Sequence, residues 1–281
     1  MKFLLGVSTA ILAVSMTAAA LGACAPGATI EKLKVATSTS LLTYIVQQVG
    51  GDKVDVFHVV PESQHPGDFD ARPGDVQRLA QASLFLVHGF PGETYVPGLV
   101  ASASNPNLKV VTAQVDGNWM TPPVQLAATD KVAAALSEAD PENGDLYESR
   151  ATGYKERVRA KEAEVRNRLA GADIGSLKAI SAGFQAGFAG WAGIKVVGTY
   201  ATPESLTAQA VKELVDKGRA EGVNLIIDNV HSGKDAGRGL AEELGAKRII
   251  LVNFPGGFEN TETWEKAMDY NVGEILKAAA R

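Results

Sequence analysis

A long helical pattern, ESRATGYKERVRAKEAEVRNRLAG, occupies residues 148–171 near the middle of the chain. Tyr154, Val158, Val165 and Leu169 are spaced to lie on one helical face, while Lys, Arg and Glu fill the other positions. Such a charge run is typical of a solvated face, on which Glu–Arg pairs stabilise the helix by a few tenths of a kcal/mol. Because strand signals are nearly absent from residues 127–169, we predict a connecting helical segment over residues 127–170.

On both sides of this segment, short strands rich in Val, Ile and Leu alternate with helices. The predicted strands are residues 33–38, 53–60, 83–89 and 108–113 before it, and 177–181, 195–200, 224–228 and 248–253 after it. The alternation predicts an α/β fold, with two Rossmann-like lobes of parallel sheet and helices (residues 25–126 and 171–281) joined by one long backbone helix. Because ligands of open α/β sheets bind at the carboxyl ends of the strands, we expect a ligand cleft between the lobes. We also expect Asp70 to cap a helix that begins near Pro73.

The first 24 residues have the anatomy of a secretory signal: Lys2, an apolar run, and small residues that end at Cys24. The last four of them, LGAC, resemble a bacterial lipobox, in which the cysteine receives lipid. The alternative is an ordinary signal with an incidental cysteine. Cys24 is the only cysteine of the chain, which excludes an internal disulfide and a CxxC motif. We predict lipidation at Cys24 and an extracytoplasmic protein anchored to the membrane by that lipid.

The composition and the missing motifs exclude several function classes. The chain has 281 residues, 46% of them hydrophobic, and a net charge of −5, without the basic surface that nucleic-acid binding requires. A GxSxG elbow, an HExxH zinc motif and a GxGxxG turn after a strand are all absent from the sequence. We therefore expect a binding protein and not an enzyme.

Three strings resemble one family: RPGDVQRLAQASLFLVHG (72–89), LSEADPENGDLYESRATGY (136–154) and AMDYNV (267–272). Together they are similar to the metal-type solute-binding proteins of bacterial ABC importers, the zinc and manganese class, over essentially the whole mature chain. The resemblance implies capture of a divalent metal ion or a metal-containing ligand between the lobes and its delivery to an ABC permease with its ATPase. A surface metallochaperone or adhesin with the same fold is an alternative. We expect a monomer.

The family's metal ligands, three histidines and a carboxylate, are replaced here. Carried over from the resemblance, their positions fall on Gly67, Pro123, Ala182 and Asn253, none of which is a usual ligand for such a cation. The family's histidine-rich loop is missing as well. The resemblance therefore implies that the family's own metal site cannot form in this chain.

A rebuilt metal site is one hypothesis. His65, His88 and His231 are each predicted at the carboxyl end of a strand, and Asp228 lies just before His231. Three imidazoles and a carboxylate are a suitable set for zinc or manganese as the transported ligand. The alternative is three loop histidines that never converge.

A changed ligand is the other hypothesis. In GFQAGFAGWAG, residues 183–193, glycines surround aromatic residues and one amide, which suits an organic molecule or a metal chelate. The residues that we predict to line the cleft are Gly67, Asp68, Pro123, Ala182, Gln185, Asn253 and Phe254.

Overall fold

The computed structural model describes residues 31–280. The predicted signal and the predicted lipidation site, Cys24, lie outside the described residues. None of the helices in the described part is both long enough and apolar enough to cross a membrane.

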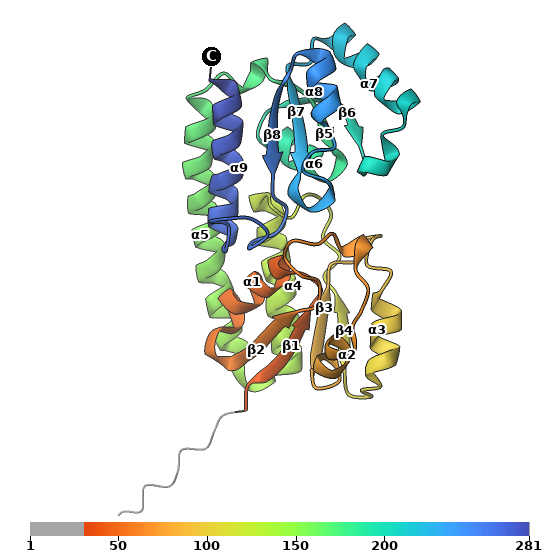
Figure 1. Cartoon of the computed structure of the whole chain (residues 1–281). Coiled ribbons are helices and arrows are strands. Elements are labelled where there is room, and N and C mark those ends of the chain that lie inside the picture. Colours follow the sequence, from red (N-terminus) through yellow and green to blue (C-terminus); the bar gives the residue numbers. More distant parts are fainter. Residues whose placement is uncertain (1–30, 281) are drawn as a thin grey trace, which may run out of the picture. The chain divides into compact units, whose positions relative to one another are not determined.

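The first lobe contains a four-stranded parallel sheet in the order β2-β1-β3-β4 (Figure 1). Its strands are β1 (Leu33–Thr37), β2 (Val54–His58), β3 (Leu84–Val87) and β4 (Lys109–Thr112), and its helices are α1 (Ser40–Gly50), α2 (Pro73–Leu79) and α3 (Val96–Ala103). All four residues of β3 are buried, as expected for a central strand with both faces covered.

The second lobe repeats this arrangement, with a parallel sheet in the order β6-β5-β7-β8. Its strands are β5 (Lys178–Ala182), β6 (Lys195–Tyr200), β7 (Leu225–Asn229) and β8 (Lys247–Leu251), and its helices are α6 (Gly183–Trp191), α7 (Ala208–Glu221), α8 (Arg238–Leu244) and α9 (Trp264–Ala279). The predicted α/β fold with two parallel-sheet lobes is therefore confirmed.

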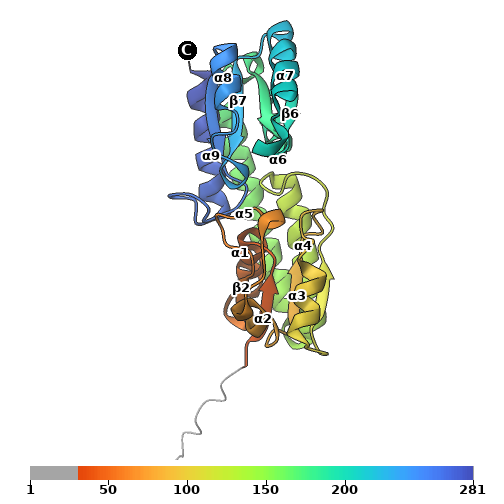
Figure 2. The same cartoon turned by 45° about the vertical axis from the view of Figure 1, so that its right-hand side comes forward.

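Two helices connect the sheets: α4 (Pro122–Ala139) and the long α5 (Gly144–Ala170). The four residues predicted to share one face of α5 are all buried, at spacings of a helical stripe. This stripe packs against α4, α1 and α9, and α9 lies beside α5 (Figures 1 and 2). The long helix thus supports both lobes.

The cap predicted for α2 is wrong. Arg72 is the N-cap residue, and its backbone N–H donates to Asp75 Oδ2 at 2.9 Å, while Asp70 lies exposed two residues earlier. A capping side chain belongs to the N-cap residue and accepts an N–H two or three residues later, and Asp70 lies two residues before the N-cap.

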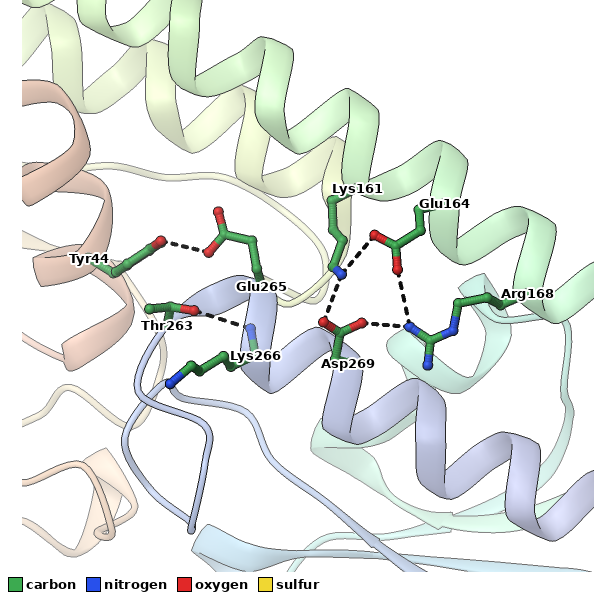
Figure 3. Close-up of polar contacts among 8 residues, drawn as sticks. All are labelled: Tyr44, Lys161, Glu164, Arg168, Thr263, Glu265, Lys266 and Asp269. Carbon is green, nitrogen blue, oxygen red and sulfur yellow. Dashed lines mark hydrogen bonds and ion pairs between the residues drawn. The ribbon is translucent and has the colours of Figure 1, made fainter.

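Polar contacts hold the two lobes together around their facing ends. The Ser40 hydroxyl donates to the Pro255 carbonyl at 2.7 Å, and the Trp264 indole donates to the Met120 carbonyl at 3.0 Å. The Tyr44 hydroxyl donates to Glu265 of α9 at 2.6 Å (Figure 3). These bonds bring the carboxyl ends of both sheets to one cleft.

Candidate ligand-binding cleft

A cleft of about 650 Å³ lies between the lobes, next to the carboxyl ends of the strands. In each sheet the second strand along the chain lies on one side of the first strand (β1 or β5), and the third and fourth strands lie on its other side. The crevice at the point where the strand order reverses is the usual ligand site of open α/β sheets. The residues that line the cleft are Leu41, His65, Pro66, Phe90, Pro91, Gly92, Gly117, Asn118, Trp119, Met120, Gly183, Phe184, Gly187, Asn253 and Phe254.

The walls of the cleft are largely apolar and aromatic. His65, Asn118 and Asn253 are the polar side chains of the lining, and none of the lining residues is Asp, Glu, Lys or Arg. The exposed fraction of Phe184 is 41%, which is unusual for a large hydrophobic residue of the described chain. Apolar walls with a few polar groups are typical of sites for organic ligands.

Two of the three polar side chains are already engaged. Asn118 donates to the Phe184 carbonyl at 2.8 Å and accepts from the Met120 N–H at 2.9 Å. His65 Nδ1 accepts from the Gly67 N–H at 3.0 Å, so a neutral ring carries its proton on Nε2. Burial lowers the pKa of His65, although the Asp68 carboxylate partly opposes this, and the ring is neutral at neutral pH. Asn253 differs, because its Oδ1 is buried without a hydrogen-bond partner.

His88 is a core residue behind the wall. Its Nε2 is 2.7 Å from the Thr39 hydroxyl, and its ring stacks on Phe90 with 4.3 Å between the centroids and meets Trp119 edge-on at 4.1 Å. Burial lowers the pKa of His88 to about 3. The imidazole is therefore neutral and covered by two rings that themselves line the cleft.

His231 occupies a similar place in the second lobe. Its ring packs edge-on against Phe254 at 4.9 Å, and its Nδ1 is 3.3 Å from Asn229 Oδ1. Burial lowers the pKa of His231 to about 4; the nearby Glu62 backbone carbonyl raises it in part, and His65 lowers it further when that ring is protonated. This buried ring lies behind Phe254.

Asp228 is fully buried within the second lobe and has its own partners. It accepts from Arg248 at 2.6 Å and from the Gly237 N–H at 2.7 Å, and the Tyr200 hydroxyl donates to it as well. A carboxylate with three donors is satisfied where it lies. It stabilises the sheet and does not face the cleft lining.

The four residues of the predicted metal set are thus not brought together. Within residues 31–280, no group of three or more His, Cys, Asp or Glu side chains is placed to hold a metal ion. The physical reason is packing, because each imidazole lies against aromatic rings: His65 against Phe184, His88 against Phe90 and Trp119, and His231 against Phe254.

Only some of the residues predicted to line the cleft belong to its lining. Asn253 and Phe254 belong to the lining, whereas Asp68 and Pro123 are exposed and Ala182 is buried beside Gly183. Gln185 is fully buried, and neither atom of its amide has a partner. A Cβ at Gly67 would meet the His65 ring at 3.0 Å, so this imidazole fills the space beside Gly67, which is exposed and outside the cleft lining.

The sequence reasoning missed one wall, which Phe90, Asn118, Trp119 and Met120 form. These residues could have been predicted, because Phe90 follows strand β3 and the segment from Gly117 follows strand β4, and residues that follow parallel strands are expected at the ligand cleft. The turn that carries Phe90 is shaped by Glu93, whose carboxylate accepts the backbone N–H groups of His88, Gly89 and Phe90 at 2.7–3.2 Å.

Two α/β lobes on a long connecting helix thus form a cleft at the carboxyl ends of both sheets. The chain belongs to the ZnuA family, zinc-uptake complex component A, periplasmic, whose model matches residues 35–278. This is a family of transport substrate-binding proteins and not of enzymes.

The sequence identity to individual relatives is low. The chain is 27% identical over 158 residues to the manganese ABC transporter substrate-binding lipoprotein PsaA of Streptococcus pneumoniae, a match over 48% of this chain and 51% of that protein. The chain thus spans about half the length of the curated relatives it matches. The structure of the solute-binding protein FpvC of Pseudomonas aeruginosa with Mn²⁺ is similar at a TM-score of 0.78, with 19% identity over 89% of this chain and 98% of that one. A manganese-bound periplasmic metal-binding protein of Candidatus Liberibacter asiaticus (S38A mutant) has a TM-score of 0.77, with 17% identity over 89% and 100%.

Proposed function

We propose that this chain is the extracytoplasmic solute-binding protein of a metal-type ABC importer. It captures a divalent metal ion or a metal-containing ligand in the cleft between the lobes and delivers it to the permease, and it catalyses no reaction. The observation that carries this proposal is a family match that spans both lobes, together with a cleft at the carboxyl ends of both sheets. Within the proposal, His65, Asn253 and Phe254 contact the ligand.

The names of the relatives support the same cargo. Similar proteins are named for manganese, for iron and for metal transport, and the similar solved structures hold manganese, nickel, zinc or cadmium. Several of these relatives are named lipoproteins, in keeping with a lipid on Cys24 that keeps a monomer beside its permease. Because α5 is a stiff support for both lobes, loading requires only small lobe movements.

An uptake assay in the source bacterium tests the proposal. Cells in which the gene is deleted should accumulate less radioactive zinc or manganese from a medium in which that metal is scarce, and the intact gene should restore the rate. A Cys24→Ser variant controls for anchoring: it should be released from the membrane and restore uptake poorly. Unchanged accumulation of both metals in the deleted strain would contradict the proposed function.

A further inference from the structure

We propose that the cleft receives its metal as a neutral chelate, in which an organic molecule with aromatic rings, and not the protein, supplies the metal ligands. The metal in this inference rests on the proposed function. The organic part rests on the walls of the cleft.

The cleft lining carries no formal charge. The lining contains no Asp, Glu, Lys or Arg, and a net charge buried without a partner is strongly unfavourable. A bare divalent ion also needs several imidazole, thiolate or carboxylate ligands. The one imidazole of the lining, His65, already uses its Nδ1 lone pair to accept the Gly67 N–H. A chelate that brings its own ligands and carries no net charge meets neither obstacle.

The walls of the cleft have the size and the chemistry of an organic-ligand site. Phe90 and Trp119 of the first lobe and Phe184 and Phe254 of the second lobe present aromatic rings to a space of about 650 Å³. This volume is within the range of about 300–1,000 Å³ found for organic ligands and far exceeds what one ion needs. Phe184 remains 41% exposed, whereas Phe188, one turn later in α6, is fully buried. Aromatic rings of a chelator would cover the surface that Phe184 leaves open.

Two polar groups of the lining still lack a hydrogen-bond partner. Asn253 Oδ1 is a buried acceptor without a partner, and the Nε2 proton of His65 is a donor at the opposite lobe. One donor and one acceptor suit the heteroatoms at the rim of a neutral chelate, and they orient it without holding the metal.

Equilibrium dialysis of the mature chain, made with Cys24→Ser to omit the lipid, tests this inference. The probes are zinc chloride, the neutral complexes zinc bis-picolinate and zinc bis-8-hydroxyquinolinate, the dianionic zinc–EDTA complex, and 8-hydroxyquinoline alone. We expect one molecule of neutral complex per chain, bound more tightly for the larger hydroxyquinolinate, and weak or no binding of the other three probes.

The possible failures differ in what they overturn. Stoichiometric binding of zinc from zinc chloride that excludes the neutral complexes would overturn the chelate but leave metal uptake intact. Binding of 8-hydroxyquinoline as tight as that of its zinc complex would indicate a metal-free ligand and contradict both proposals. Neutral complexes that bind no better than zinc–EDTA would overturn the chelate alone.

A matched pair of variants locates the bound complex. Phe184→Ala should weaken binding of zinc bis-8-hydroxyquinolinate about tenfold, because an aromatic wall is lost. Phe258→Ala removes a phenylalanine of similar exposure, 43%, that lies outside the cleft lining, and it should leave the affinity unchanged. Equal affinities of the two variants would show that the complex does not bind in the cleft.

Discussion

The cleft wall and the contact between α5 and α9, which we call the seam, differ in their content of charged side chains. In the seam, Lys161 and Arg168 of α5 both contact Asp269 of α9, at 2.7 and 2.6 Å, with Glu164 beside them (Figure 3). The cleft lining has no charged side chain, and buried histidines behind it are neutral. The fold therefore places these ionic groups in a partly solvated seam and leaves the cleft a neutral, aromatic surface.

The strongest test of this contrast is the pH dependence of stability. The pKa values of His88 and His231 are about 3 and about 4 in the folded chain and 6.5 for an ordinary histidine. Below pH 6.5 the unfolded chain binds protons that the folded chain does not, so the stabilisation present above pH 6.5 is lost as the pH falls towards 4. Urea unfolding should show a loss of about 2.5 kcal/mol for each histidine between pH 7.5 and pH 4.5.

Two single variants assign that loss. His88→Gln and His231→Gln each remove one titrating ring. Each variant should therefore take up about one proton fewer on unfolding near pH 5, which makes the plot of unfolding free energy against pH less steep. A pH dependence identical to that of the unaltered chain in both variants would show that these rings are not held neutral beside the cleft.

The next largest effect concerns the fully buried carboxylate. Asp228→Ala should lower the free energy of unfolding by about 3 kcal/mol, because it leaves Arg248, the Gly237 N–H and the Tyr200 hydroxyl without their acceptor. Asp235→Ala, which removes an exposed partner of the same arginine, is the control and should have little effect. If Asp228→Ala also abolished chelate binding in a chain that remained folded, Asp228 would be a cleft residue after all.

The ion pairs of the seam should contribute less than Asp228 to the free energy of unfolding. Asp269→Ala should lower the free energy of unfolding by about 1 kcal/mol in urea, since its side chain is 43% exposed but accepts from two cations in one network. Asp216→Ala breaks an isolated exposed pair with Lys212 and should change stability much less. Equal effects of the two variants would mean that the α5–α9 network adds nothing beyond a surface ion pair.

The sequence predicted the fold well because the fold depends on patterns that are repeated along the chain. The strands at 84–87 and 225–229 are short apolar runs, and the stripe from Tyr154 to Leu169 is a helical repeat that only a buried face explains. The location of the cleft followed from the general rule for parallel strands.

Which side chains face the cleft could not be predicted in the same way. His88 and Phe90 follow the same strand, and the turn that Glu93 holds buries the first behind the second. Asp228 lies near the carboxyl end of β7, but Arg248 and Tyr200, both more than 15 residues away in the chain, engage it. Residue types at strand ends are visible in a sequence, whereas their burial and partners depend on contacts between distant segments.

The smallest expected effect on stability is the one that bears most on the cleft. Phe184→Ser should change the free energy of unfolding by only about 0.5 kcal/mol, because the side chain is 41% exposed; its ring lies against that of His65, with 4.7 Å between the centroids. Phe188→Ala in the same helix is the matched control: it empties a fully buried position and should cost about 3–5 kcal/mol. Urea unfolding of both variants measures the difference. A loss for Phe184→Ser near that of Phe188→Ala would mean that the fold needs this ring, and its exposure in the cleft would no longer indicate a ligand. A small loss of unfolding free energy would show that the fold does not require this aromatic side chain. Its exposure on a neutral wall would then be explained by a bound molecule that covers it.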